Sequence, residues 1–277
     1  MNYLPLTPPG QTPTRVMTIA GTDSGGGAGI QADSRTFALL GVHACVAVVA
    51  VTVQNSLGVR GFHEIPIDVI TGQIEAVAGD IGIQAAKTGM LASSEIISAV
   101  AQTWRGLHTD APLVVDPVCA SMHGDPLLHP SALDAMRTEL FPIATLVTPN
   151  LDEVLLITGI DVVDAASQKD AARALHAMGP AWALVKGGHL RSSSHSPDLL
   201  FDGTEFHEFD AERIDTRHDH GAGDTLAAAT ACALARGYTV PEAVGFAKQW
   251  VTECLRAAYP LGGGHGPVSA LFRLANP

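Results

Sequence analysis

Short, almost continuously apolar segments recur along this chain, and each is followed by a segment with apolar residues at helical spacing. The first two, 15–21 (RVMTIAG) and 44–54 (ACVAVVAVTVQ), are rich in β-branched residues. Strands of this kind are covered on both faces, as in parallel sheets, whereas a strand with one wet face alternates. Between them, 29–41 has helical spacing and ends on Gly41, where a helix C-cap belongs. The segment therefore predicts a β-α-β unit with parallel strands.

The same alternation continues toward the C-terminus. Further strands are predicted at 85–90, 112–117, 145–150 and 182–188. Further helices are predicted at 66–78, 94–105, 131–139 and 168–178, followed by a hairpin at 197–210 and helices at 221–237 and 241–258. This order indicates an α/β fold in which helices cover both faces of a central, mainly parallel sheet.

Length and composition set the domain organisation. With 277 residues and 47% apolar content the chain can bury one large core, so we expect a single domain over 15–277. The preceding segment 1–14 contains four prolines and has neither a basic stretch nor a long apolar run. We expect it to be a disordered leader rather than a signal peptide.

Charge and cysteine content narrow the classes of partner. Sixteen Lys and Arg against 28 Asp and Glu give a net charge of -12, which opposes binding to nucleic acid or to an anionic membrane surface. No apolar run approaches the roughly 18 residues of a membrane-spanning helix. The cysteines at 45, 119, 232 and 254 form neither a CxxC pair nor a zinc pattern with histidine. We therefore expect a soluble protein in the reducing cytoplasm.

Almost every predicted strand ends in polar or flexible residues. They are Gly21-Thr22-Asp23, Gln54-Asn55, Lys87-Thr88-Gly89-Met90, Asp116-Pro117, Pro149-Asn150 and Lys186-Gly187-Gly188. In α/β folds ligands gather at the carboxyl ends of the strands, where the following helices present N–H groups. We expect the functional site at this edge of the sheet.

The glycine-rich stretch 21–33 (GTDSGGGAGIQAD) matches neither of two familiar nucleotide motifs. A P-loop requires Lys and Ser/Thr where Ile30 and Gln31 stand. A dinucleotide fingerprint requires an acid at the end of the second strand, where Gln54 stands. The stretch predicts a loop whose backbone can approach a small ligand, followed by Asp33 one turn into a helix. The alternative is a helix capped by Asp23 with Asp33 in solvent.

A second small-residue stretch, 217–237, begins RHDHGAGDT. Gly221, Ala222 and Gly223 leave space for an anion at the first turn of a helix, whose N–H groups and dipole favour a transferring phosphoryl group. Asp224 would then lie beside that group, where a base can orient an attacking hydroxyl and take its proton. A simple capped turn has the same pattern. The histidines of RHDH we interpret as loop residues, since HxH without a third ligand makes no metal site.

Three further segments supply groups suited to phosphates and a cation. TPNLDE places Asn150 and Glu153 at a helix start, where they can hold metal-bound water. Lys186 ends a strand and could reach the β or γ phosphate, and Asp116 ends another as a second candidate near magnesium. Each alone fits a structural ion pair equally well. Together they are predicted to line one edge.

The motifs resemble those of a known family. Seven blocks stand in the family's order: TIAGTDSGGGAGIQAD, VTVQNSLGV, KTGML, DPVCASMHGDPLL, TPNLDE, VKGGH and HGAGDT. They are similar to the hydroxymethylpyrimidine/phosphomethylpyrimidine kinases of thiamine synthesis, within the ribokinase-like small-molecule kinases. The resemblance covers the chain from about Arg15 onward. It implies a ribokinase-like three-layer sandwich, ATP with Mg²⁺, phosphoryl transfer to a pyrimidine methanol, and a homodimer.

The resemblance also implies residue roles. Those around the pyrimidine would be Gly21, Ala28, Asp33, Gln54, Met90 and the backbone near Val118. Those serving phosphates and metal would be Lys186, Asn150, Glu153 and Asp116, with Gly221, Ala222 and Gly223 at the anion hole and Asp224 as the base.

The chain departs from the family pattern at two positions. Asp224 stands where many members have Cys, and Met122 stands where relatives often have Lys, which removes a charge that could clamp a substrate phosphate. Met122 therefore puts the second step, phosphorylation of the monophosphate, in question. Two other functions remain open: a pyridoxal or related vitamin kinase on the same fold, and a non-catalytic nucleotide sensor. The complete catalytic set disfavours the sensor.

Overall fold

The computed structural model describes residues 4–119, 130–189 and 195–275. These residues form one nine-stranded sheet in the order β3-β2-β1-β4-β5-β6-β7-β8-β9. The strands are β1 (Arg15–Gly21), β2 (His43–Asn55), β3 (Gly58–Glu64), β4 (Ala85–Thr88), β5 (Leu113–Val115), β6 (Leu146–Val147), β7 (Trp182–Val185), β8 (Asp198–Phe201) and β9 (Phe206–Phe209). The six central strands pair in parallel, while β3, β8 and β9 pair antiparallel at the two edges.

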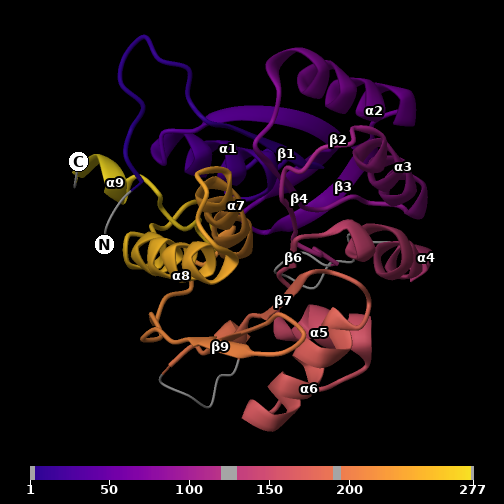
Figure 1. The fold of residues 1–277 in the computed structure, drawn as a ribbon. Helices are drawn as coiled ribbons and strands as arrows, with labels where there is room; N and C mark the ends of the chain where they lie inside the picture. The colour runs from indigo at the N-terminus through magenta and orange to yellow at the C-terminus, as the bar shows by residue number, and fades with distance from the viewer. Residues whose placement is uncertain (1–3, 120–129, 190–194, 276–277) are drawn as a thin grey trace.

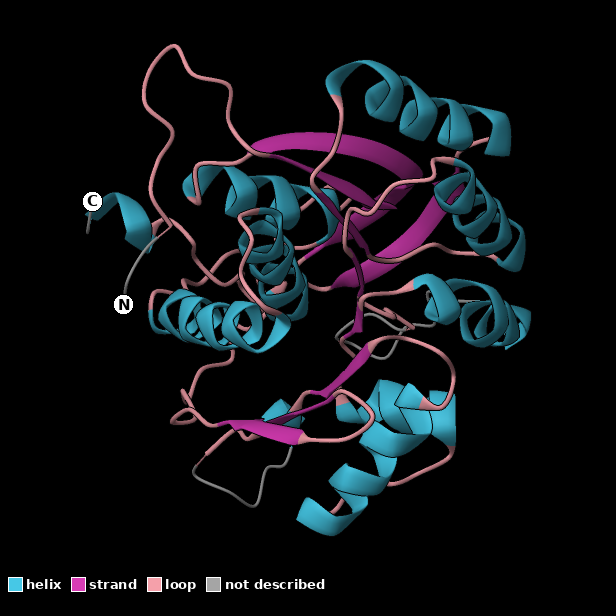
Figure 2. Cartoon of the chain, in the orientation of Figure 1, coloured by secondary structure: helices cyan, strands magenta, loops and turns pink. Residues whose placement is uncertain are grey.

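Helices cover both faces of this sheet (Figure 1; Figure 2). One face carries α1 (Gly29–Leu39), α7 (Ala222–Ala235) and α8 (Val240–Arg256), with the short α9 (Phe272–Ala275) beside α8. The other carries α2 (Ile67–Ala76), α3 (Ser94–Gly106), α4 (Pro130–Ala135), α5 (Leu151–Thr158) and α6 (Ala165–His176). The π-helical turns Val77–Ile81 and Met136–Leu140 extend α2 and α4, and 3₁₀ turns lie at Phe141–Ile143 and Gly187–His189. Each face has its own apolar core, which confirms the three-layer architecture.

Alternation along the central strands decides which side chains face α1 and α7. Val16 and Ala85 belong to the core beneath α1, α7 and α8, whereas Met17 and Ala86 belong to the opposite core. Because strand side chains alternate between faces, Lys87 points toward α1 and α7. The chain runs from β1 outward to β2 and then returns to β4 on the other side of β1. This reversal is the switch point where ligands bind in α/β sheets.

Most predicted elements are confirmed, with local differences. The sequence missed β3 and α9, and β6 covers only two residues of the strand predicted at 145–150. The strand predicted at 85–90 ends at Thr88, because Met90 lies beyond the ladder. Helix α6 starts at Ala165, three residues before the prediction, where Asp164 accepts a capping hydrogen bond from the Ser167 N–H.

The segment before β1 has no regular secondary structure in its described part. Leu4 is nevertheless fully buried in the core beneath α7 and α8, and Arg236 donates a 2.8 Å hydrogen bond to the carbonyl of Pro5. These contacts contrast with the disorder expected for 1–14, which stays a prediction for the segment as a whole.

Among the described residues, no helix has the length and apolar content needed to cross a membrane. All four cysteines are buried free thiols.

Candidate active site

At the N-terminus of α7, the glycine-rich loop lies so close to Gly221 that no side chain fits there. Gly221, its N-cap, has φ 78°, and a Cβ there would lie 2.0 Å from the carbonyl oxygen of Gly27. An L-residue is disfavoured by this backbone conformation and by the contact. The glycine-rich loop at 23–29 therefore packs directly against the start of α7.

The next glycine faces charged groups instead of backbone. A Cβ on Gly223 would lie 3.2 Å from Lys186 Nζ and 3.6 Å from Asp116 Oδ2. The first N–H groups of an α-helix have no acceptor within the helix, and the dipole there favours an anion. The structure therefore places the Lys186 ammonium beside Gly223 at the start of α7, where the helix N-terminus also favours an anion.

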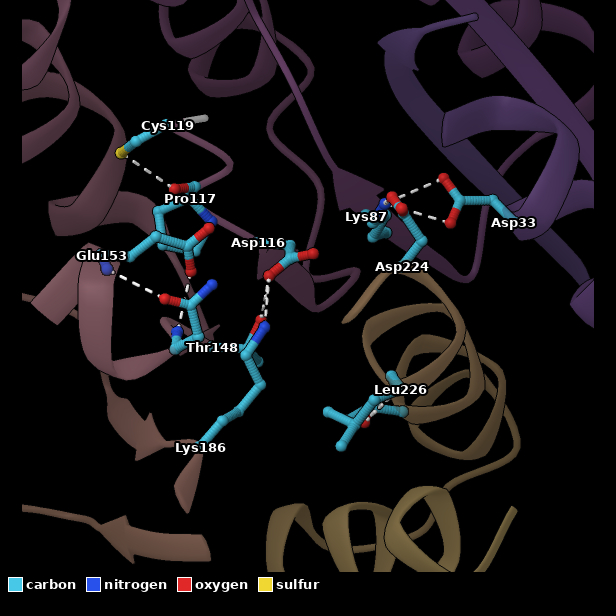
Figure 3. Close-up of polar contacts among 12 residues, drawn as sticks. Asp33, Lys87, Asp116, Pro117, Cys119, Thr148, Glu153, Lys186, Asp224 and Leu226 are labelled. Carbon is cyan, nitrogen blue, oxygen red and sulfur yellow. Dashed lines mark hydrogen bonds and ion pairs between the residues drawn. The ribbon is translucent and has the colours of Figure 1, made fainter. Parts of the chain in front are cut away.

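Asp224, in the first turn of α7, belongs to a buried charge cluster with Lys87 and Asp33 (Figure 3). Lys87 Nζ lies 2.8 Å from Asp224 Oδ1 and 3.0 Å from each carboxylate oxygen of Asp33. Lys87 and Asp33 have no exposed side-chain surface, whereas the Asp224 side chain is 15% exposed. Asp224 is thus the member of this cluster that a ligand can reach.

The cluster keeps Asp224 charged. Burial disfavours its carboxylate, but the Lys87 ammonium and its hydrogen bond outweigh burial and hold the pKa of Asp224 below its ordinary value. Burial raises the pKa of Asp33 to about 7 against the opposing effect of Lys87. For Lys87, burial is outweighed by the two carboxylates, so its pKa is raised and the ammonium persists. An ionised Asp224 is the state that a general base requires.

Asp116 and Lys186 form a second charged group opposite the first (Figure 3). Lys186 Nζ lies 3.1 Å from Asp116 Oδ1, and the Thr148 hydroxyl donates to the same oxygen at 3.0 Å. The N–H of Lys186 donates to the carbonyl of Pro149 at 3.0 Å, so Lys186 is positioned beside the start of α5. Lys186 Nζ thus lies near Gly223, while Lys87 Nζ contacts Asp224 in the same first turn of α7.

Asn150 and Glu153 form a reciprocal capping box at the start of α5. Asn150 Oδ1 accepts from the Glu153 N–H at 2.9 Å, and Glu153 Oε2 accepts from the Asn150 N–H at 2.7 Å. Burial raises the pKa of Glu153 to about 8, with Asp116 adding to the shift and Lys186 opposing it. A bound cation would reverse this shift, because it stabilises the charged carboxylate.

Asp23 organises the glycine-rich loop rather than capping α1. Its carboxylate accepts from the N–H groups of Gly25, Gly27 and Ala28 at 2.8 to 2.9 Å. Nε2 of His220 lies 2.9 Å from the same carboxylate. His220 lies in the loop before α7, as interpreted from the sequence, and this contact ties the glycine-rich loop to the residue before Gly221.

Three of the predicted substrate residues, Gly21, Met90 and Gln54, lie beside this loop. The Gly21 N–H donates to the carbonyl of Met90 at 3.1 Å, and a Cβ on Gly21 would meet Met90 Cε at 2.6 Å. At the end of β2, the N–H and carbonyl of Gln54 both bond the Ser24 hydroxyl, at 2.8 and 2.7 Å. Val118 follows β5, with its N–H donating to the Asp116 carbonyl.

The position of Asp33 differs from the prediction. Both of its oxygens are used by Lys87, and Oδ2 also accepts from Thr18 Oγ1 at 2.6 Å. A fully buried, fully paired carboxylate has no free face for a pyrimidine, nor does it lie in solvent as the alternative held. Lys87 was missed as a site residue, although a charged residue inside the apolar strand AAKT was the signal that could have found it.

Comparisons with known proteins identify the family. The family model described as phosphomethylpyrimidine kinase matches residues 23–269. A hydroxymethylpyrimidine/phosphomethylpyrimidine kinase of Mycobacterium tuberculosis is 72% identical over 275 residues, covering 99% of this chain and 100% of the relative. The thiamine biosynthesis bifunctional protein ThiED of Geobacter sulfurreducens is 44% identical and matches over 93% of this chain and 52% of that protein.

Solved structures show the same architecture. An ADP complex of Bacillus subtilis pyridoxal kinase has a TM-score of 0.87 at 33% identity, over 95% of this chain and 100% of that one. Staphylococcus aureus pyridoxal kinase with AMP-PCP and pyridoxal has a TM-score of 0.85 at 34% identity, over 93% of each chain. A phosphomethylpyrimidine kinase of Clostridium difficile has a TM-score of 0.77 at 37% identity, over 87% of this chain and 98% of that one. The fold is therefore ribokinase-like, and the chain belongs to the phosphomethylpyrimidine kinase family.

Proposed function

We propose that this protein is an ATP-dependent kinase of thiamine biosynthesis. Its substrates are 4-amino-5-hydroxymethyl-2-methylpyrimidine and the corresponding monophosphate, which it converts to the diphosphate. The observation that carries the proposal is the accessible, ionised Asp224 within the first turn of α7, beside the space between Gly223 and Lys186. The match to the kinase of M. tuberculosis along the whole chain supports the choice of substrate.

The chain's groups divide the reaction between them. Asp224 orients the substrate hydroxyl and accepts its proton as the oxygen bonds to the γ-phosphorus and the bond to the ADP oxygen breaks. The N–H groups at the α7 start and the Lys186 ammonium stabilise the charge on the transferring group. Gly221 and Gly223 keep that position free of side chains.

The donor set fits a magnesium ion held jointly with phosphates. Among the described residues no three His, Cys, Asp or Glu side chains converge as a metal cluster. Mg²⁺ with a nucleotide needs only one or two carboxylates, with phosphate oxygens and waters completing the octahedron. Asp116 and Glu153 would supply those carboxylates, with Glu153 held by its capping box with Asn150, and the bound ion would neutralise phosphate charge.

Replacement of Asp116 by Asn is expected to raise the Mg²⁺ concentration for half-maximal rate about 10-fold or more, as for loss of a metal-orienting group. Rate is measured against free Mg²⁺ at fixed ATP. Recovery at high Mg²⁺ indicates a metal role, whereas a loss that Mg²⁺ cannot restore indicates that Asp116 only anchors Lys186. The exposed Asp134 on α4, which pairs with Arg137, provides the control Asp134→Asn, which should leave the Mg²⁺ curve unchanged.

The choice between a pyrimidine and pyridoxal rests on Gln54. A carboxamide offers an acceptor and two donors in one plane, which matches the ring nitrogen and exocyclic amine of a 4-aminopyrimidine better than the phenol edge of pyridoxal. The Ser24 hydroxyl holds the backbone of Gln54 rather than its amide. The alternative that the Gln54 amide merely satisfies the loop is therefore weakened.

Gln54→Leu is expected to narrow or reverse the preference for hydroxymethylpyrimidine over pyridoxal. Loss of a buried two-point hydrogen bond can change discrimination by up to about 10⁴-fold. The measurement is kcat/KM for both alcohols with wild type and variant. Ser24→Ala is the matched control, because it removes the loop anchor but keeps the amide, and the preference should persist. An equal and unchanged kcat/KM for both alcohols would favour a pyridoxal kinase.

That second candidate has support of its own. The S. aureus and B. subtilis pyridoxal kinases have higher TM-scores than the C. difficile phosphomethylpyrimidine kinase, although their sequence identities are lower. Purified protein with Mg-ATP, a panel of vitamin alcohols and their monophosphates, and phosphorus NMR of the products distinguishes the two functions. Met122, whose identity bears on the monophosphate step, lies outside the described residues, so Met122→Lys is the variant to measure if only the free alcohol reacts.

We also propose a homodimer. Apolar side chains stand exposed on β2 and its edge partner β3, with Val53 59%, Val51 48% and Phe62 40% accessible. Such a surface is typical of one that a second protein chain covers. Light scattering behind size-exclusion chromatography measures the mass directly. The four free thiols support the cytoplasmic location expected from the sequence.

A further inference from the structure

Lys87 is the charged residue of an otherwise uncharged strand. It lies in the four-residue strand β4, AAKT, in which every residue is buried. Its side chain has no exposed surface. A buried ammonium is strongly destabilising unless it is paired and its protons are satisfied. The position therefore needs a reason beyond packing, and a methionine would fill similar space without charge.

The three donors of Lys87 match three carboxylate oxygens. An ammonium has three N–H bonds, and Lys87 Nζ lies 3.0 Å from both oxygens of Asp33 and 2.8 Å from Asp224 Oδ1. One carboxylate would suffice to neutralise the charge. The second, Asp224, comes from α7 and is the one exposed to a ligand.

The surroundings leave Lys87 little freedom. The Thr18 hydroxyl holds Asp33 at 2.6 Å, so the counter-ion is fixed to β1. On the other side, a Cβ on Gly89 would lie only 3.0 Å from Lys87 Nζ. Neighbouring elements therefore set where the ammonium points, and the ammonium in turn sets where the Asp224 oxygen lies.

We propose that Lys87 is a positioning residue for phosphoryl transfer: it fixes the Asp224 carboxylate beside the α7 N-terminus, while Asp33 and Thr18 hold Lys87 in place. Lys87 does not touch the nucleotide or the alcohol, because it is fully buried behind Asp224. Lys87 acts on the reaction only by setting the position of the Asp224 carboxylate. This inference rests on the proposed kinase function.

The test compares Lys87→Met with the double variant Lys87→Met/Asp33→Asn. Lys87→Met should lower kcat about 10²-fold, the scale of a misplaced reacting group, and leave KM for ATP within about 3-fold. Without Lys87 the buried Asp33 loses its counter-ion and must take up a proton to stay buried, so the Tm should fall. The double variant replaces this carboxyl by a neutral amide, so its Tm should recover while kcat stays low.

The double variant separates positioning from structure. If Lys87 only neutralises Asp33, removing both charges restores kcat together with Tm, and the proposal is overturned. A Lys87→Met variant that keeps kcat within about 3-fold of wild type overturns it as well. If Lys87→Met alone does not fold, the double variant decides, since it carries no unpaired buried charge except the partly exposed Asp224.

A second buried lysine provides the matched control. Lys248 on α8 pairs with Asp198 on β8 at 2.8 Å, with both side chains nearly inaccessible. Lys248→Met should lower Tm as Lys87→Met does, but keep kcat within about 3-fold. If the wild type transfers phosphate to an alcohol other than the pyrimidine, the substrate assignment is wrong. The variants are then measured on that alcohol. A wild type that transfers phosphate to no alcohol overturns both proposals.

Discussion

Asp224→Asn is expected to lower kcat by about 10²- to 10⁴-fold and to leave ATP affinity within a few-fold, as loss of a positioned general base does. The amide keeps the shape of the side chain but can neither accept the proton nor carry the charge that orients the hydroxyl. Lys87 retains Asp33 as its partner, so the fold should persist. Steady-state kinetics and calorimetric titration with ATP measure the two effects separately.

The pH profile gives an independent check on the same residue. Because Lys87 holds the pKa of Asp224 below its ordinary value, the base stays ionised as the pH falls toward the usual carboxyl range. The acid limb of kcat/KM attributable to Asp224, which reports the free enzyme, should therefore lie below that range and disappear in Asp224→Asn. Near-normal kcat in the variant would show that Asp224 is a helix residue without a role in proton transfer.

Gly223→Val is expected to lower kcat by about 10²-fold or more, comparable to removing a donor from an anion hole. The Cβ alone would lie 3.2 Å from Lys186 Nζ, and the two γ-methyl groups would fill the space proposed for the phosphoryl group. Gly223 does not have a positive φ, so the substitution introduces no backbone strain of the kind expected at Gly221. The loss of rate should thus exceed the loss of Tm.

Gly72→Val is the matched control, since Gly72 lies within α2 and a Cβ there meets no atom within 4 Å. It reports the cost of valine in a helix without the steric effect. If Gly223→Val melts early yet turns over normally when folded, the glycine serves the backbone alone and the anion hole lies elsewhere.

The sheet could be predicted from the sequence because its central strands are apolar on both faces. Edge elements carry a weaker signal: β3, GVRGFHE, contains two glycines and three charged or imidazole side chains, and much of it is exposed. The β6 ladder covers only Leu146 and Val147, the two apolar residues of the strand predicted at 145–150, so the prediction was too long on its polar side.

Only part of the site could be predicted, because local sequence patterns do not show contacts between distant residues. The position of Asp224 follows from local pattern, since the glycines before it and the helix after it are adjacent in sequence. The role of Lys87 depends on partners 54 and 137 residues away, which no local pattern shows. Asp33 was assigned to the substrate for the same reason, because its pairing with Lys87 is set by the packing of α1 on β1, the strand next to β4.

The order in which the chain is made gives the buried cluster a consequence for biogenesis. Thr18, Asp33 and Lys87 leave the ribosome well before α7, which packs against α1, α8 and three central strands. Until α7 docks, the apolar side of those strands remains uncovered and Lys87 has only one counter-ion. Docking of α7 brings its part of the core and the proposed base, Asp224, into place together. We therefore expect a chain truncated before α7 to transfer no phosphoryl group, even where its first strands are formed.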